Sequence, residues 1–90
     1  MVKEKVRPSV FEKDDSSIIH ELILFNDDVN TFEFVIQILI EVCGHEPQQA
    51  EQCAMVAHFK GKCGVKSGGY QEIRLLYDEM TIRGLTVTIQ

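Results

Sequence analysis

The strongest constraint on this chain is the polar segment Asn26-Asp27-Asp28, which separates one apolar run from a second, strongly apolar segment. Asn and Asp side chains hydrogen-bond to nearby backbone, so they favour turns and disfavour strands. The preceding run is therefore expected to end here. Asn30 is a favoured helix N-cap, and Glu33 three residues later can reach back to its amide, close to a capping box. The sequence predicts a strand and a helix joined by a loop that carries two carboxylates.

Two functions of this loop are compatible with the local pattern. In the first, the loop is a solvated turn whose acidic side chains favour the N-terminus of the following helix electrostatically. In the second, hydrogen-bond acceptors beside an apolar groove form a binding site for a cationic group. The local pattern alone leaves both open.

The other elements follow from hydrophobic periodicity and turn residues. Residues 18–25 are short and branched, as in a strand, and residues 31–42 form an apolar helix that Gly44 can cap. Pro47 suits the first turn of a second helix, which Gly61 would cap. Further patterns predict a strand at 62–66, a turn at 67–69, a helix at 70–83 and a strand at 85–89. The expected order is strand, helix, helix, strand, helix, strand.

Length and composition limit the class of protein. Ninety residues make one domain, expected over residues 18–90, and residues 1–17 have no periodicity and are expected to form a mobile N-terminal arm. A net charge of −5 argues against nucleic-acid binding. The sequence has no signal-peptide core and no stretch near the roughly 20 apolar residues of a membrane helix. With three cysteines and no C-x-x-C pair, we expect a cytoplasmic protein, and nothing in the sequence demands more than a monomer.

Cofactor and enzyme chemistry have weak support. A zinc site would draw on residues whose spacing fits no familiar pattern, namely Cys43, His45, Cys53, His58 and Cys63. The turn around Gly68 lacks the lysine-threonine ending of a P-loop. A cysteine hydrolase using Cys53 or Cys63 remains as an alternative, but nothing marks an oxyanion hole or a nucleophile elbow. We therefore expect no metal, no cofactor and no catalysis.

A binding site for an α-amine is the remaining hypothesis. A protonated amine has three hydrogens, and an Asn oxygen, an Asp carboxylate and a neutral imidazole nitrogen, such as that of His58, can accept them. The second helix carries a stripe of small residues at Ala50, Ala54 and Ala57. If this stripe faces the apolar first helix, the space between them can hold the side chain next to the amine.

The same residues resemble a known family. The loop Asn26-Asp27-Asp28, the helix that begins with Thr31-Phe32-Glu33-Phe34-Val35-Ile36, and the segments Ala50-Glu51-Gln52 and His58-x-x-Gly61-Lys62 are similar, in this order, to ClpS. ClpS proteins are bacterial adaptors that hand N-degron substrates to the Clp protease unfoldase. The resemblance runs from about Leu22 to Gln90, and is strongest to the compact versions from Bacteroidetes-type bacteria.

The resemblance carries several implications. It implies an α+β fold, an α/β sandwich of a three-stranded antiparallel sheet and three helices, similar in topology to the C-terminal domain of the ribosomal stalk protein. It implies that Asn26, Asp27 and His58 bind the substrate's free α-amine. It also implies a pocket for a bulky N-terminal Leu, Phe, Tyr or Trp, lined by Asn30, Phe32, Val35, Ala54, Ala57 and Leu85. The implied partner is the N-terminal domain of a ClpA- or ClpC-like AAA+ unfoldase, which the arm would engage.

A second class of function stays open at this stage. The acidic composition and the weak catalytic signature also fit a protein-interaction module of the same topology that has no α-amine pocket. The two hypotheses differ in whether Asp27 and His58 are needed for binding.

Overall fold

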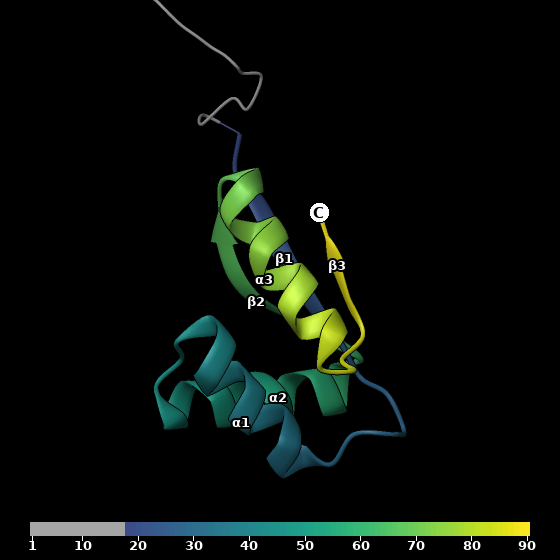
Figure 1. The fold of residues 1–90 in the computed structure, drawn as a ribbon. Coiled ribbons are helices and arrows are strands. Elements are labelled where there is room, and N and C mark those ends of the chain that lie inside the picture. The colour runs from purple at the N-terminus through teal and green to yellow at the C-terminus, as the bar shows by residue number, and fades with distance from the viewer. Residues whose placement is uncertain (1–17) are drawn as a thin grey trace, which may run out of the picture.

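The structure, a computed structural model, describes residues 18–90. Its elements are β1 (His20–Phe25), α1 (Phe32–Cys43), α2 (Pro47–Lys60), β2 (Lys62–Gly68), α3 (Tyr70–Ile82) and β3 (Val87–Ile89), as Figure 1 shows. The expected order and the antiparallel α/β sandwich are confirmed. The expected N-terminal arm, residues 1–17, lies outside the described residues.

The central strand of the sheet is β1, because the strand order is β2-β1-β3 and both pairings are antiparallel. Its residues Leu22, Ile23 and Leu24 are all buried. A strand covered on both faces needs apolar side chains at every position, which explains why the sequence does not alternate here. The strand begins at His20, two residues later than expected.

A bulge shapes the pairing of β2 with β1. Leu22 pairs with Lys66 but Ile23 pairs with Gly64, so Val65 is the extra residue. Beyond the bulge, pairing continues to Gly68, and residues 67 and 68, expected in a turn, belong to the strand. The backbone ladder with β1 therefore overrides the local turn preference of Ser and Gly.

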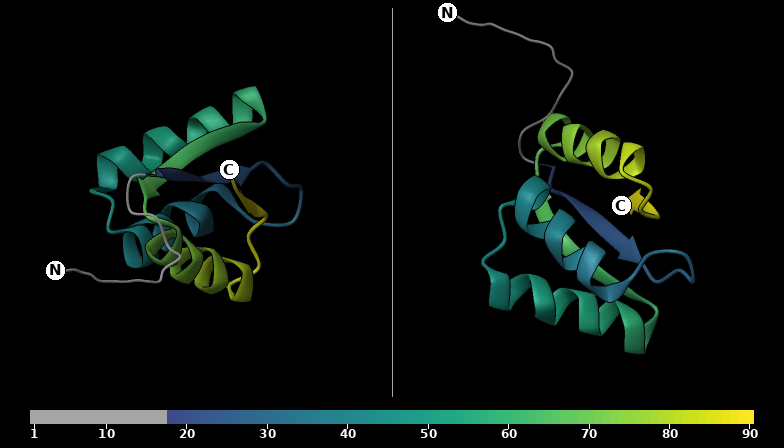
Figure 2. Two further views of the ribbon diagram at one scale, coloured as in Figure 1. Left: turned by 90° about the horizontal axis from the view of Figure 1, so that it is seen from above. Right: turned by 60° about the horizontal axis from the view of Figure 1, so that its bottom comes forward.

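The helices cover the sheet from two sides. In both views of Figure 2, α2 and α3 lie on opposite sides of the molecule with α1 between them. The helix α1 contacts both of the others, as its nearly all-round apolar sequence predicts. The largest fully buried side chains come from these helices and from β1: Leu22, Leu24, Ile38, Leu39, Ile73 and Met80.

The C-terminal ends of α1 and α2 agree with the sequence, but the start of α1 does not. Gly44 and Gly61 cap α1 and α2 with φ of 73° and 93°, in the left-handed region that glycine adopts without strain. The N-cap of α1 is Thr31, whose Oγ1 accepts a hydrogen bond from the Phe34 N–H at 3.1 Å. The prediction of Asn30 as the cap was wrong, because the Asn30 side chain is bound elsewhere in the loop.

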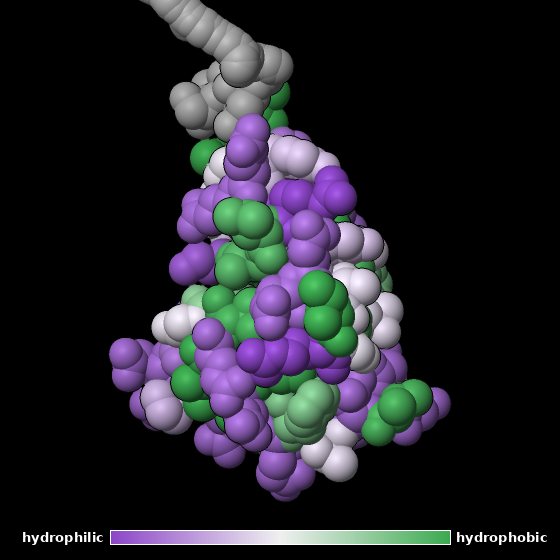
Figure 3. Space-filling model, in the orientation of Figure 1, coloured by the Kyte–Doolittle hydropathy of each residue, from purple (hydrophilic) through white to green (hydrophobic). Residues whose placement is uncertain are grey.

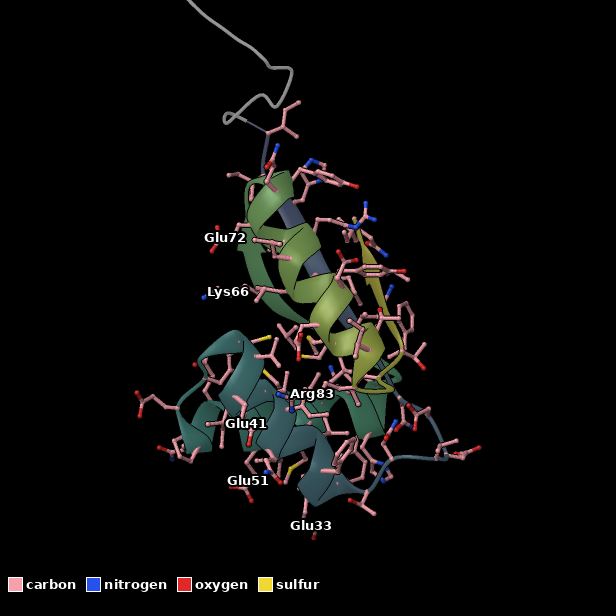
Figure 4. The ribbon with its side chains drawn as sticks, in the orientation of Figure 1. Glu33, Glu41, Glu51, Lys66, Glu72 and Arg83 are labelled. Carbon is pink, nitrogen blue, oxygen red and sulfur yellow. The ribbon has the colours of Figure 1, made fainter. Side chains whose placement is uncertain are left out.

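The C-terminal segment turns sharply between α3 and β3. Gly84 has φ of 93°, and the Leu85 N–H donates to the Met80 carbonyl at 3.0 Å. Arg83, just before this turn, forms ion pairs with Glu41 on α1 at 2.8 Å and with Glu79 on α3 at 3.1 Å. Figure 4 labels Arg83 and Glu41. The pair with Glu41 joins the end of α3 to α1. The strand β3 begins at Val87 and is two residues shorter than the expected strand at 85–89.

The surface is a mixture of polar and apolar patches. On the face shown in Figure 3, where α3 lies in front, apolar patches are separated by polar side chains. The most exposed large apolar residues on α3 are Leu75 and Ile82, which are 72% and 79% exposed. Among the helices of residues 18–90, none has the length and apolar character needed to cross a membrane.

Candidate functional site

One cavity, of about 320 Å³, lies where the end of β1, the loop that follows it and the helices α1 and α2 meet. Its lining consists of Leu24, Phe25, Asn26, Asp27, Asp28, Asn30, Phe32, Val35, Ala54, Ala57 and His58. All the site residues predicted from the sequence, except Leu85, are therefore brought together. The cavity has a polar mouth and an apolar floor.

The polar mouth is organised by the carboxylate of Asp27. Its Oδ1 accepts the backbone N–H groups of Val29 and Asn30, both at 2.9 Å. Its Oδ2 accepts the Nδ2–H of Asn30 at 2.9 Å. These bonds form an Asx-type turn that fixes the loop and the direction of the carboxylate.

Two anchors hold this loop against the ends of other elements. The Asn26 N–H donates to the carbonyl of Gly61, at the end of α2, at 3.0 Å. The Asn30 side chain donates to the carbonyl of Gly84, after α3, at 3.0 Å. The turns at Gly61 and Gly84 thus position the mouth. Gly61 lies 35 residues after Asn26 in the sequence, and Gly84 lies 54 residues after Asn30.

The loop keeps Asp27 ionised at neutral pH. Partial burial raises the pKa of its carboxyl, but the hydrogen bonds from Asn30, Val29 and the Thr86 side chain outweigh that effect. The net result is a pKa below the ordinary value of 3.8. A half-buried, ionised carboxylate at the mouth of a cavity is a suitable partner for an ammonium group.

His58 approaches the mouth from the last turn of α2. Its ring is exposed and meets the ring of Phe59 edge-on, with centroids 5.0 Å apart. Gly61 ends the helix three residues later and also binds Asn26. One turn therefore sets the position of both His58 and Asn26, two of the three predicted amine ligands.

The apolar floor comes from the facing sides of the two helices. Phe32 and Val35 from α1 are half-buried, whereas Ala54 and Ala57 from α2 are each 4% exposed. Because alanine projects only a methyl group, the space in front of α2 remains empty. A cavity of this size, apolar with a few convergent polar groups, is typical of a small-ligand site.

The predicted pocket residue Leu85 is not part of the cavity lining. It follows the turn at Gly84, is 5% exposed and belongs to the hydrophobic core. The hydrogen bond between its N–H and the Met80 carbonyl folds it back onto α3. Leu85 is thus placed in the core beside the turn at Gly84, and its assignment to the pocket stays a prediction.

The cavity also contains lining residues that the sequence reasoning did not assign to it. The sequence assigns Leu24 and Phe25 to the strand alone, and Asp28 to the turn as one of its two carboxylates, without naming it as an amine ligand. Their position in the sequence indicates that they can line the cavity, because each of the three lies within two residues of Asn26 or Asp27.

The candidate zinc ligands do not form a cluster. Across residues 18–90, no group of three or more His, Cys, Asp or Glu is placed to hold a metal ion. Cys43 is buried with its Sγ 3.6 Å from the Met80 sulfur, and the Nε2–H of buried His45 donates to the Val65 carbonyl at 2.7 Å. Cys43 and His45 are thus engaged by contacts with other residues of the protein.

The comparisons with known proteins agree on one family. The sequence model described as "ATP-dependent Clp protease adaptor protein ClpS" matches residues 16–88. The ClpS adapter of Nitratidesulfovibrio vulgaris is 39% identical over 56 residues, covering 60% of this chain and 56% of that protein. The ClpS adapter of Desulforapulum autotrophicum is 35% identical over 65 residues (70% and 62%), and that of Escherichia coli O1:K1 is 32% identical over 77 residues (83% and 69%).

A solved structure shows the same fold. Agrobacterium tumefaciens ClpS2, bound to L-phenylalaninamide, matches with a TM-score of 0.77 at 24% identity, over 80% of this chain and 94% of that one. The matched region spans only 56% and 62% of the length of the first two curated relatives.

Proposed function

Because the chain belongs to the ClpS family of Clp protease adaptors, we propose that it binds proteins through a free, bulky apolar N-terminal residue. We propose further that it delivers these proteins to a Clp unfoldase for degradation. The observation that carries the proposal is the cavity of about 320 Å³ with acceptors at its mouth and an apolar floor. The matched ClpS2 structure holds a phenylalanine derivative with a free amine, which is a ligand of this chemical type.

The two halves of the cavity fit the two halves of an N-terminal residue. Asn26, Asp27 and His58 supply an amide oxygen, a carboxylate and an imidazole, which together can accept the three hydrogens of an ammonium group. Phe32, Val35 and the two alanines contact the side chain. Acetylation of the amine removes its charge and two of its hydrogens, so it should abolish binding.

The expected affinity is micromolar. Hydrogen bonds to charged groups contribute roughly 1.5–3 kcal/mol each. Burial of one large apolar side chain adds about 1.5–3 kcal/mol. Association costs at least about 4 kcal/mol, which leaves a binding free energy near −8 kcal/mol at best. Such an affinity suits an adaptor that must release its substrate.

The experiment is fluorescence anisotropy of the purified protein with short peptides that begin with Leu, Phe, Tyr, Trp, Ala or Arg. Each peptide is measured with a free and with an acetylated terminus. Binding of the bulky apolar set, with free amines only, supports the proposal. Equal binding of acetylated peptides contradicts the amine site, and failure of every peptide to bind would favour a protein-interaction module without that site.

The roles of Asp27 and His58, two of the three proposed acceptors, are tested by substitution. The double variant Asp27→Ala, His58→Ala should lose peptide binding while keeping its helical circular dichroism. Leu75→Ala, an exposed change on α3 outside the cavity lining, is the matched control and should bind as the unchanged protein does. A double variant that binds with unchanged affinity contradicts these roles.

The finer features of the delivery step belong to the same proposal. We propose a monomeric, non-catalytic adaptor that acts in the cytoplasm and docks on the N-terminal domain of a ClpA- or ClpC-like unfoldase. Degradation of a reporter with an N-terminal Phe by a purified Clp protease, with and without the adaptor, tests delivery. A protein that binds the reporter but does not accelerate its degradation would limit the function to recognition.

A further inference from the structure

An exposed apolar ridge on α2, formed by Met55 and Phe59, borders the cavity. Phe59 is 76% exposed, and Met55, one turn earlier on the same helix, is 44% exposed. The Phe59 ring meets the His58 ring edge-on, with the two ring centroids 5.0 Å apart. His58 lines the cavity, whereas Phe59 does not. The ridge therefore begins where the cavity lining ends.

The position of the ridge follows from the helical repeat of α2. Residues four apart lie one above the other on a helix, so Ala54 and His58 form one row, which lines the cavity. Met55 and Phe59 form the next row around the helix. On the other flank of the lining row, Cys53 is half-buried and packs against the core. The ridge thus lies on the flank of the cavity lining that faces solvent.

The proposed mode of binding determines where a substrate chain leaves the cavity. The amine is held by Asn26, Asp27 and His58, and the first side chain occupies the apolar floor. The carbonyl group of the first residue must then point out of the mouth. The Cα atom of the second residue lies about 3.8 Å from that of the first. The second side chain therefore comes within contact range of residues that adjoin His58.

We propose that the ridge is a subsite for the second residue of the substrate, with Phe59 as the residue that selects an apolar side chain there. This inference rests on the proposed function, because it requires the amine to be held at the mouth. An apolar second side chain removes the exposed ring from water, which is favourable. A polar second side chain loses water without gaining a partner, since the Phe59 ring has no hydrogen-bonding group and the Met55 sulfur is a weak acceptor.

Other exposed apolar side chains lack these relations to the cavity. Isolated exposed apolar residues such as Leu75 and Ile82 on α3 are normal on protein surfaces. Val29 is 87% exposed in the loop of the mouth, but its neighbours Asp28 and Asn30 are polar. The ridge differs from both cases because it combines two apolar residues in one row with a ring contact to a lining residue.

Peptides that differ only at the second residue test the subsite. One peptide begins with Phe-Leu and the other with Phe-Asn, because Asn is close to Leu in size but has a polar side chain. Both are measured by fluorescence anisotropy with a free amine. We expect the Phe-Leu peptide to bind about threefold to tenfold more tightly, since partial burial of the Leu side chain favours binding. Equal affinity, or tighter binding of the Phe-Asn peptide, would overturn the proposal.

Substitutions test whether the preference depends on the ridge. Phe59→Ala should bring the ratio of the two dissociation constants close to one, whereas Phe59→Tyr, which keeps the ring, should retain it. The matched control is Ile82→Ala, which removes a side chain of similar exposure, 79%, from α3 and should leave the ratio unchanged. A ratio that Phe59→Ala leaves unchanged, or that Val29→Ala abolishes instead, would contradict the assignment to Phe59.

A purely positioning role of Phe59 predicts a different result. If its ring only holds the His58 ring in place, Phe59→Ala weakens the binding of both peptides by the same factor and keeps their ratio. That outcome would overturn the subsite. Met55→Ala provides a second variant, because Met55 is on the ridge but is not next to His58 in the sequence. It should lower the ratio while retaining the affinity for the Phe-Asn peptide.

Failure of the subsite is distinguishable from failure of the proposed function. If both peptides bind equally and both lose binding when their amines are acetylated, the amine site stands and the second-residue preference is wrong. If neither peptide binds with a free amine, the proposed function fails and this inference fails with it.

Discussion

Asp27 has two roles in the loop, as the residue that organises it and as a candidate ligand. Replacement Asp27→Asn removes the negative charge and turns one acceptor into a donor that clashes electrostatically with the Asn30 Nδ2–H group. Since hydrogen bonds to charged groups contribute about 1.5–3 kcal/mol each, the dissociation constant for a free-amine peptide should rise at least tenfold. Anisotropy measures this change.

The comparison variant is Asp28→Asn, which removes the same charge from the same loop. Asp28 is exposed, and the N–H groups of Val29 and Asn30 donate to the Asp27 carboxylate rather than to that of Asp28. The effect of Asp28→Asn should therefore be much smaller. Equal losses in the two variants would show that the overall charge of the loop, rather than the placement of Asp27, determines binding.

The lowered pKa of Asp27 also predicts a pH dependence of folding. The unfolded carboxyl takes up its proton near pH 3.8, whereas the folded one does so at lower pH. Between these values the unfolded state binds more protons than the folded state. The contribution of Asp27 to the free energy of unfolding is therefore present above about pH 4 and is lost as the pH falls through the folded pKa. Urea unfolding at pH 5 and pH 3 should show a larger loss for the unchanged protein than for Asp27→Asn. Identical losses would contradict the shift.

At the scale of single elements, the start of α1 depends on Thr31. Replacement Thr31→Ala removes the acceptor for the Phe34 N–H and should lower the free energy of unfolding by about 0.5–2 kcal/mol. Thr31→Ser keeps the hydroxyl and is expected to recover most of that loss in urea titrations. If Thr31→Ala is neutral and Asn30→Ala removes the stability of the helix instead, the cap has been misassigned.

The end of α2 depends on Gly61, whose φ of 93° places it in the left-handed region. Gly61→Ala should cost about 1–2 kcal/mol of stability because the added Cβ is disfavoured at this φ. Gly69 provides the matched control, since its φ is −66° and no atom lies within 4 Å of an added Cβ. Thermal unfolding of Gly69→Ala should differ little from that of the unchanged protein. Similar losses at both glycines would contradict the explanation.

Considering the whole molecule, a bound N-terminal residue should stabilise the fold, because it joins the loop to both helices of the cavity. A ligand present at 100 times its dissociation constant contributes about 2.7 kcal/mol, and about 1 kcal/mol shifts the Tm of a small domain by roughly 4–8 °C. A free-amine Phe peptide should therefore raise the Tm by about 10 °C or more at this excess. The acetylated peptide should leave the Tm unchanged, and equal shifts would contradict recognition of the amine.

The sequence predicts the elements well because their signals are local. The glycines at 44 and 61, Pro47 and the periodicity of α3 each act within a few residues, and the structure confirms these ends. The errors occur where distant partners decide. Asn30 has the sequence signature of a cap, but the Gly84 carbonyl, from the far end of the chain, binds its side chain. The sequence predicts a turn at residues 67 and 68, whereas in the structure they pair with β1 and belong to a strand.

The candidate site shows the same division. The amide, carboxylate and imidazole acceptors are visible in the sequence as residue types, and the alanine stripe as a spacing. The resemblance to a family predicts that these acceptors and alanines lie together, and all of them line the cavity except Ala50. The core position of Leu85 depends on the bond between its N–H and the Met80 carbonyl, which has no local sequence signal.

The two anchors of the loop have a consequence for how such a site can diversify. Asn26 and Asn30 are held through the carbonyl groups of Gly61 and Gly84, which every amino acid possesses, whereas the floor consists of side chains on α1 and α2. Substitutions on the inner faces of the helices can therefore change the shape of the floor and leave the proposed amine ligands in place. Under the proposed function, recognition of the amine and choice among side chains depend on different residues, so a library of variants at Phe32, Val35, Ala54 and Ala57 should change the preferred side chain and keep the requirement for a free amine.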